Sequence, residues 1–287
     1  MKKKVTPLDF IVVFLVIVIT LVILLPLLNM LAVSFSKTGY IIQNKVSFFP
    51  KGFNLDAYEM VLKQGRILRS YLNSIQYAVI GTFINLLMTA VAAYPLSRKR
   101  LAGRSVVMKL IVFTMFFSGG LIPTYMLIQN LGLIDKMWAL VLPNAIWTFE
   151  LLILKSFYES LGHEVFESAT IDGASEYRIL FQIVIPLSKA ALSSIGLFYF
   201  MGHWNSFFIP MIYLNTASKY PLQLVLREML IDATVQNPGI VNQQMNSLTP
   251  EAMKNATILL TMLPVLFVYP YAQRYFVKGV MLGSVKG

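Results

Sequence analysis

The sequence predicts an all-α integral membrane protein with six transmembrane helices. Of its 287 residues, 57% are hydrophobic and only 13% are charged, whereas roughly 25% of the residues of a typical soluble protein are charged. The apolar residues gather in runs long enough to cross a bilayer, which needs about 20 of them in one helix. Basic residues gather in short segments between the runs, as they do beside the cytoplasmic face of a membrane.

The first span is predicted over residues 10–33. The run from Phe10 to Leu28 contains one polar side chain, Thr20, and no charge. Three lysines at 2–4 precede it, as in a signal peptide, but the apolar run is too long for one and no good cleavage site follows. We therefore expect an uncleaved anchor.

Five further spans are predicted, and each is less apolar than the first. Asn85, Asn144 and Asn205 lie inside them, which indicates helices that face one another rather than lipid alone. The predicted ranges are 72–96, 110–130, 137–157, 190–214 and 255–276. The chain as a whole, 1–287, is expected to form a single transmembrane domain in the cell membrane.

The basic residues predict the orientation of the chain in the bilayer. The short segment 98–109 holds five Lys or Arg residues, and short loops rich in Lys and Arg stay on the cytoplasmic side. Segment 34–71 is also basic but longer, so it weighs less. Both termini are then cytoplasmic, segments 34–71 and 215–254 lie outside, and segment 158–189 lies inside.

The composition also excludes several functions. The absence of cysteine excludes disulfides, thiolate metal sites and cysteine nucleophiles. His163 and His203 lie far apart and neither has a metal-ligand spacing, so we expect no metal and no cofactor. Membrane flanks explain the net charge of +11, and no basic cluster is interleaved with stacking aromatic residues. We therefore expect no nucleic-acid partner.

The cytoplasmic segment 158–189 is the most informative part of the sequence. Its small residues are Ser168, Ala169, Gly173 and Ala174. Its acidic residues include Glu164, Glu167, Asp172 and Glu176, on a face otherwise rich in Lys and Arg. Gly173 permits a chain reversal, and Pro186 marks the boundary between a loop helix and the next span. These features favour a docking element, and the alternative is an ordinary helix-turn-helix connection.

This segment resembles the EAA loop of ABC importer permeases. That loop reads Glu-Ala-Ala, three residues, Gly, nine residues and Ile-x-Leu-Pro. Glu167-Ser168-Ala169, Gly173 and Ile183-Val184-Ile185-Pro186 stand at the same spacing, with Ser168 and Ile185 as substitutions of similar size. The resemblance implies the MetI-like fold of type I importer permeases. It also implies coupling to an ATPase through Glu167, Ser168, Ala169, Asp172, Gly173, Ala174 and Pro186.

The resemblance extends over nearly the whole chain. Segments 273–279 and 284–287 are similar to the tail of MalG-like carbohydrate permeases, and 119–125, 202–206 and 220–222 resemble the LplC/YtcP branch, associated with complex oligosaccharides. It implies a second, non-identical permease, two ATP-binding subunits, an external solute-binding protein and a sugar or oligosaccharide substrate. The tail residues implied to contact the ATPases are Lys278, Lys286 and Gly287. No G-x-x-x-x-G-K-[ST] occurs, so the ATPase is expected to be a separate polypeptide and the chain itself no enzyme.

Two groups of residues are candidates for the sugar pathway. His203, Trp204 and Asn205 lie half-way along the span 190–214, where polar groups are costly unless they are used or paired. The alternative is that they only hold helices together. Gly120 and Tyr125 lie where Gly and Pro residues break the span 110–130, which suggests an outer gate or a simple kink.

Glu150 departs from the neutral polar residue expected in the family at that position. It is either a proton-coupling group or a structural acid, for which Lys155 is a candidate partner. An ion-gradient-driven secondary transporter is the alternative function, but no inverted repeat is visible. A membrane enzyme would need converging His, Asp or Glu residues, and no nucleophile or base dyad is found. Dependence on ATP separates the importer from both.

Overall fold

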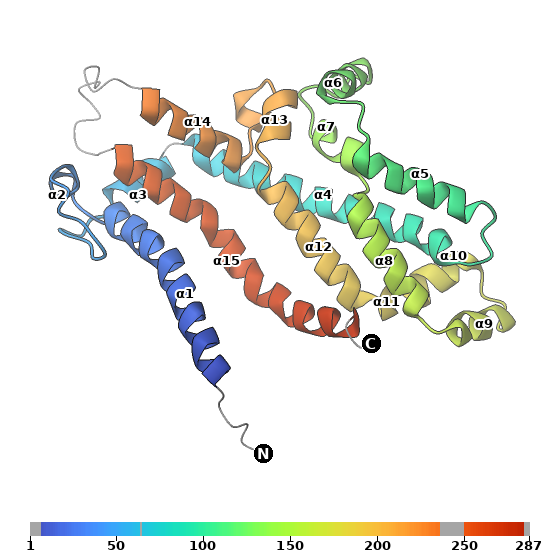
Figure 1. Cartoon of the computed structure of the whole chain (residues 1–287). Coiled ribbons are helices and arrows are strands. Elements are labelled where there is room, and N and C mark those ends of the chain that lie inside the picture. Colours follow the sequence, from blue (N-terminus) through green and yellow to red (C-terminus); the bar gives the residue numbers. More distant parts are fainter. Residues whose placement is uncertain (1–6, 64, 236–249, 284–287) are drawn as a thin grey trace. The chain divides into compact units, whose positions relative to one another are not determined.

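The computed structural model describes residues 7–63, 65–235 and 250–283, and its regular elements there are helices (Figure 1). An isolated antiparallel bridge joins Ser36 and Phe53. The chain divides into two compact units, which we call the first unit (1–68 and 226–263) and the second unit (69–225 and 264–287).

The first unit is built around the long helix α1 (Pro7–Ser34). Nearly every side chain between Leu8 and Leu25 is exposed and apolar, which in a soluble protein would be a large unfavourable surface. A helix that is apolar on all sides is suited to lipid. The other elements of this unit are α2 (Thr38–Ile42), α3 (Asp56–Lys63) and parts of α4 (Gly65–Ser97), α14 (Leu222–Val235) and α15 (Pro250–Gly283).

The second unit holds the rest of α4 and the helices that follow it. These are α5 (Arg104–Phe116), α6 (Leu121–Asn130), α7 (Trp138–Val141), the 3-10 turn η1 (Leu142–Asn144), α8 (Thr148–Ser160), α9 (His163–Ile171), α10 (Glu176–Arg178), the π-helical segment η2 (Ile179–Val184), α11 (Ile185–Leu187), α12 (Lys189–Trp204), α13 (Phe208–Tyr213) and the 3-10 turn η3 (Ala217–Lys219). Helix α8 packs against both α5 and α12. Its core residues Leu154 and Tyr158 are fully buried together with Tyr199 of α12.

Within the described residues, two helices, α1 and α4, are long and apolar enough to cross a membrane unaided. Three bent helix pairs raise the number to five if each pair forms one span. The bends are 112° between α5 and α6, 51° between α7–η1 and α8, and 81° between α10–α11 and α12. The segment predicted as a sixth span, 255–276, lies within α15.

Backbone chemistry explains two of these bends. Gly120 stands directly before α6 with a φ of 86°, a conformation that residues with a side chain rarely adopt. The third bend follows Pro186, which has no N–H to continue the helical hydrogen bonds and is preceded by the π-helical segment η2. The break at Gly120 falls inside the span predicted over 110–130, whereas the break after Pro186 falls in the segment 158–189, predicted as a cytoplasmic loop.

Candidate functional site

Helix α9 and the turn after it hold the residues that the sequence predicted for coupling, except Pro186, which lies in α11. The helix ends in a tight reversal, in which the N–H of Gly173 donates to the carbonyl of Thr170 over 3.1 Å and the N–H of Ala174 donates to Ala169 over 2.9 Å. Gly173 adopts a φ of 77°, as this pair of hydrogen bonds requires. The local sequence therefore fixes where α9 stops and where the chain turns back toward α10.

The two faces of α9 differ in burial. Phe166 and Ala169 point into the core of the second unit, with 4% and 7% of their surface exposed. Glu167 and Asp172 are exposed on the other side, and Ile171 between them is 85% exposed. Sequence reasoning missed Ile171, although a large apolar residue next to the acidic residues was a usable signal. Ile171 lies outside the predicted spans, so its exposed side chain is a candidate contact for a partner protein.

Arginines of the short basic turn 97–104 hold the inner side of this segment. The guanidinium of Arg98 lies 4.1 Å from the centre of the Phe166 ring, a cation–π contact. Arg100 forms an ion pair with Glu176 of α10, and Arg104 forms one with Glu159 of α8. The sequence predicted both segments to be cytoplasmic, and the fold brings them together.

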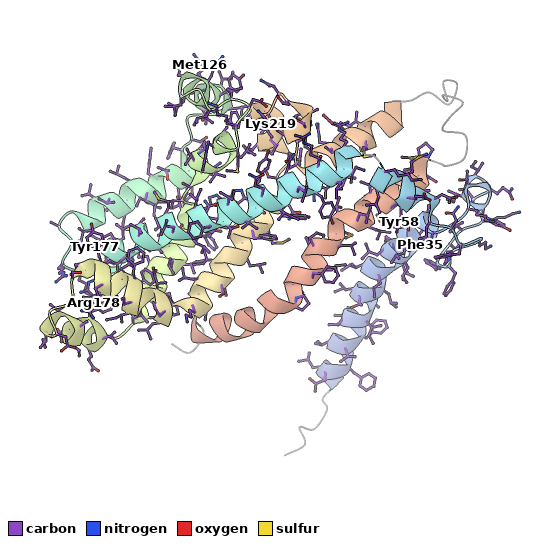
Figure 2. The ribbon with its side chains drawn as sticks, turned by 180° about the vertical axis from the view of Figure 1, so that it is seen from behind. Phe35, Tyr58, Met126, Tyr177, Arg178 and Lys219 are labelled. Atoms are coloured by element: carbon purple, nitrogen blue, oxygen red, sulfur yellow. The ribbon has the colours of Figure 1, made fainter. Side chains whose placement is uncertain are left out.

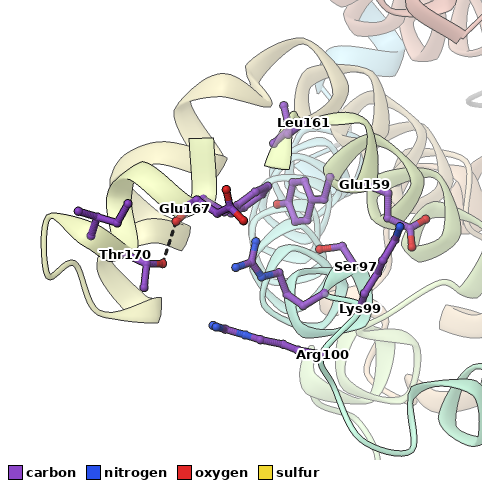
Figure 3. A pocket seen from close by; sticks show the side chains of 11 residues that line it. Ser97, Lys99, Arg100, Glu159, Leu161, Glu167 and Thr170 are labelled. Carbon is purple, nitrogen blue, oxygen red and sulfur yellow. Dashed lines mark hydrogen bonds between the residues drawn. The ribbon is translucent and has the colours of Figure 1, made fainter. Parts of the chain in front are cut away.

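A cavity of about 520 Å³ lies between this basic turn and α9 (Figure 3). It is lined by Lys99 and Arg100 of the basic turn, by Glu159 of α8, and by Glu167 and Thr170 of α9. The cavity is thus bordered by charges of both signs. Further contacts rigidify the walls, since Lys155 pairs with Glu159 over 2.8 Å and Thr170 donates to the carbonyl of Phe166 over 2.8 Å.

A second group of polar residues connects α4 to α12 inside the second unit. The amide nitrogen of Asn85 donates to the carbonyls of Asn144 and Ala145 over 2.7 and 2.9 Å. Its oxygen lies 2.6 Å from Nε2 of His203. Asn85 is fully buried, so these bonds satisfy an amide that would otherwise be costly at membrane depth. Asn85 of α4 therefore connects the backbone between η1 and α8 to His203 of α12 through hydrogen bonds.

Aromatic residues extend this contact toward α8. The hydroxyls of Thr89 and Tyr199 lie 2.6 Å apart. The backbone N–H of Trp147 donates to the Tyr199 hydroxyl over 3.3 Å. The rings of Trp147 and Tyr199 meet edge to face at 4.9 Å. Gly202 allows this approach, because a Cβ there would stand 2.1 Å from a ring carbon of Trp147. The start of α8 and the end of α12 are thus closely packed next to His203, one of the polar residues predicted for the sugar pathway.

The predicted pathway residues differ in exposure. Trp204 is 1% exposed and packs against Tyr71 and Phe200, so it offers no face to a passing sugar within this chain. Asn205, directly after it, is exposed. His203, directly before Trp204, is half-buried and points its ring toward Asn85.

Gly120 and Tyr125 lie apart from that cluster. Gly120 is exposed, and a Cβ on it would meet only Pro123, at 3.9 Å. Tyr125 of α6 stacks on Tyr213 of α13 with ring centres 6.0 Å apart. The structure does not bring these two residues together with His203 in one site.

Glu150 is buried in the first turn of α8, where the partial positive charge of a helix start favours an acid. Lys155 is not its partner, since Lys155 forms its ion pair with Glu159, four residues further on. A separation of four positions places two side chains on the same face of a helix, whereas the separation of five positions from Glu150 to Lys155 does not. In the described residues no group of three His, Cys, Asp or Glu side chains is placed to hold a metal ion.

At the end of the second unit away from α9, Asp135 binds Asn215, Thr216 and Lys219, a group that we call the Asp135 clamp. The carboxylate of Asp135 accepts hydrogen bonds from the N–H groups of Asn215 and Thr216, both over 3.0 Å, and from Lys219 over 2.6 Å. The Lys219 ammonium, with these N–H groups, holds the pKa of Asp135 well below its usual range. Lys219 is labelled in Figure 2. Sequence reasoning missed this clamp, because its members are some 80 residues apart.

Part of the predicted ATPase-contacting tail falls outside the described residues. Lys286 and Gly287 lie there, and Lys278 lies in α15. The described site residues therefore belong to α4, the basic turn, α6, α8 to α12, the Asp135 clamp and, for Lys278, α15.

Comparison with known proteins adds relatives of matching length. No protein-family model matches the chain. Protein LplC of Bacillus subtilis (strain 168) is 43% identical over 267 residues, which cover 92% of this chain and 90% of that protein. The polygalacturonan/rhamnogalacturonan transport system permease protein YtcP of the same strain is 41% identical, covering 93% of this chain and 94% of that protein.

A solved structure is also similar. It is a bacterial ABC transporter involved in the import of the acidic polysaccharide alginate, and one of its chains superposes with a TM-score of 0.88 and 30% identity. The match covers 96% of this chain and 100% of that one. These similarities give no support to an ion-gradient-driven secondary transporter or to a membrane enzyme.

Proposed function

The chain belongs to the permease subunits of sugar ABC importers, and from this membership we propose that it conducts oligosaccharides across the cell membrane. ATP drives the transport, and a solute-binding protein delivers the oligosaccharide. Membership in this family implies other ABC subunits and a binding protein as partners. The relative named for polygalacturonan/rhamnogalacturonan transport and the similar importer of alginate support an oligosaccharide rather than a single sugar as cargo.

The two faces of α9 carry this proposal. Its outer face shows Ile171 between Glu167 and Asp172, and its inner face is held by Arg98. An ATPase that grips the outer face would move the segment as a unit, because ion pairs connect α8 and α10 to the basic turn. Ser168, Ala169, Gly173, Ala174 and Pro186 belong to this segment and are proposed, with Glu167 and Asp172, to couple it to the ATPase. Such a grip can drive the permease between two states only if its contacts differ between them.

The remaining architecture follows from the family. We propose six spans of the MetI-like type, with α15 as the sixth and both termini in the cytoplasm. A second, non-identical permease completes the path, two ATP-binding subunits dock at α9 and its counterpart, and the binding protein approaches the outer face. The tail residues Lys278, Lys286 and Gly287 are proposed to reach the ATPases.

We assign the sugar path to residues that remain accessible. Asn205 and the edge of His203 supply hydrogen-bonding groups, and Tyr125 supplies an aromatic face near the irregular segment at Gly120. Trp204 and Glu150 are buried and support the helices around the path.

The decisive test replaces Ile171 with Asp in the full complex. A charge in the apolar contact should remove most of the ATPase from the purified assembly while the second permease stays bound, because Ile171 is 85% exposed and its replacement leaves the buried core of the second unit intact. Ile171→Leu is the matched control and should retain the ATPase. Normal ATPase recovery with Ile171→Asp, and normal uptake, would exclude α9 as the docking element.

A further inference from the structure

The segment that follows α1 folds back along it. Helix α1 ends at Ser34, yet the side-chain amide of Asn29 donates a hydrogen bond to the carbonyl of Ser47 over 2.7 Å. Asn29 precedes Ser34 by five residues, which is about 7.5 Å along a helix axis. Phe48 and Phe49 therefore lie beside the last turns of α1 rather than beyond its end.

The base of this returning loop is fixed. The N–H of Lys51 donates to the hydroxyl of Ser36 over 2.9 Å, and Ser36 also forms the bridge to Phe53. The ring of Phe35 stacks against both Phe53 and Tyr58, with centres 5.5 and 4.8 Å apart (Figure 2). The loop is therefore held against α1 at two places, its base and Asn29.

The depth of the loop follows from the length of the helix. The charge-free run of α1 begins at Phe10, and about 20 helical residues cross the hydrocarbon core of a bilayer. Counted from Phe10, the twentieth residue is Asn29, the first amide in the run. The hydrogen bond from Asn29 to Ser47 thus lies near the C-terminal end of the predicted span 10–33, close to where the hydrocarbon meets the lipid headgroups.

The exposed side chains of the loop match this boundary. Phe49 is 81% exposed, Ile42 68% and Phe48 46%. Lys45 and Lys51 flank them and are exposed as well. The sequence has no acidic residue between Asp9 and Asp56, so the loop itself carries no negative side chain to offset these two cations. Aromatic rings at the boundary, with lysines that extend to the headgroups, form a typical membrane-interface contact.

We propose that residues 42–51, which we call the anchor loop, rest in the lipid leaflet at the C-terminal end of α1. Phe48 and Phe49 enter the boundary of the hydrocarbon, and Lys45 and Lys51 bind lipid phosphates. The loop thereby sets the depth and tilt of α1. The proposal requires that α1 crosses the membrane, and it does not depend on what the protein transports.

Spin labels can measure this placement, because the chain has no cysteine of its own. Phe49→Cys is labelled with a nitroxide in the full chain, reconstituted with its partners in phospholipid nanodiscs. Oxygen, which concentrates in lipid, should relax this label several-fold more than a water-soluble nickel chelate. Leu15→Cys in the middle of α1 is the lipid control, and Glu59→Cys on α3 is the water control, where the order should reverse.

Two results would overturn the proposal. A label at Phe49 that meets the nickel chelate as freely as the label at Glu59 would place the loop in water. A label that neither reagent reaches would show that a partner protein covers it. In nanodiscs that contain phosphatidylglycerol, Lys45→Glu with Lys51→Glu should raise nickel access at position 49. Unchanged access would refute the binding of lipid phosphates by these lysines.

Discussion

At Gly202 the packing between helices leaves no room for a methyl group. A Cβ would stand 2.1 Å from Trp147, whereas one at Gly196 of the same helix would meet only the flexible end of Leu86, at 3.1 Å. Both Gly→Ala changes gain the same helix propensity, so their difference isolates the clash. We expect Gly202→Ala to cost about 1–3 kcal/mol more than Gly196→Ala, measured as thermal unfolding in detergent. Equal stability of the two variants would show that Trp147 moves away freely.

The Asp135 clamp gives an expectation for the pH dependence of stability. Its pKa is lowered in the folded state by Lys219 and the N–H groups of Thr216 and Asn215. A lowered pKa stabilises the fold above the unfolded value of about 3.9, and the contribution is lost as the pH falls toward the folded value. The gap in melting temperature between the wild type and Asp135→Asn should therefore stay constant from about pH 5 to about pH 8 and shrink in stronger acid. A gap that changes near neutral pH would contradict this account.

At the scale of elements, the Arg104–Glu159 ion pair joins α8, the helix that leads into α9, to the basic turn. Reversing one partner of the Arg104–Glu159 pair places like charges together, so Arg104→Glu and Glu159→Arg should each lower sugar uptake. The double reversal should recover part of the loss, with a coupling energy on the order of 0.5–1 kcal/mol for a partly exposed pair.

A pair on α3 provides the control for this exchange. Lys63 and Glu59 are also ion-paired, but their side chains are 75% and 60% exposed. Reversing them should leave uptake unchanged, because exposed pairs contribute little. Uptake lost equally in both exchanges would point to a general effect of charge rather than to coupling.

At the scale of the whole molecule, the orientation in the membrane can be tested with single cysteines. Lys99 lies in the basic turn and Asn215 beside the Asp135 clamp, and both are exposed. With both termini in the cytoplasm, a membrane-impermeant maleimide should label Asn215→Cys in intact cells and label Lys99→Cys only after the membrane is opened. The reverse pattern would invert the topology and place α9 outside, away from any ATPase.

The sequence by itself determined the class of protein and predicted which segment couples it to an ATPase. Apolar runs, short basic loops and the spacing from Glu167 to Pro186 are local properties, readable without knowing which residues meet. The reversal at Gly173 is local too, since it depends on a single backbone conformation. These features therefore pointed to a membrane permease before any contact was known.

Only the tertiary structure decided which side chains are free to act. Trp204 is buried by Tyr71 and Phe200, whereas Ile171 is exposed, and neither outcome is visible in the residues next to them. The Arg98 contact with Phe166 likewise joins segments far apart in the chain. Burial and pairing depend on packing between distant elements, so the sequence pattern can nominate a residue for a site but its exposure is set by the fold.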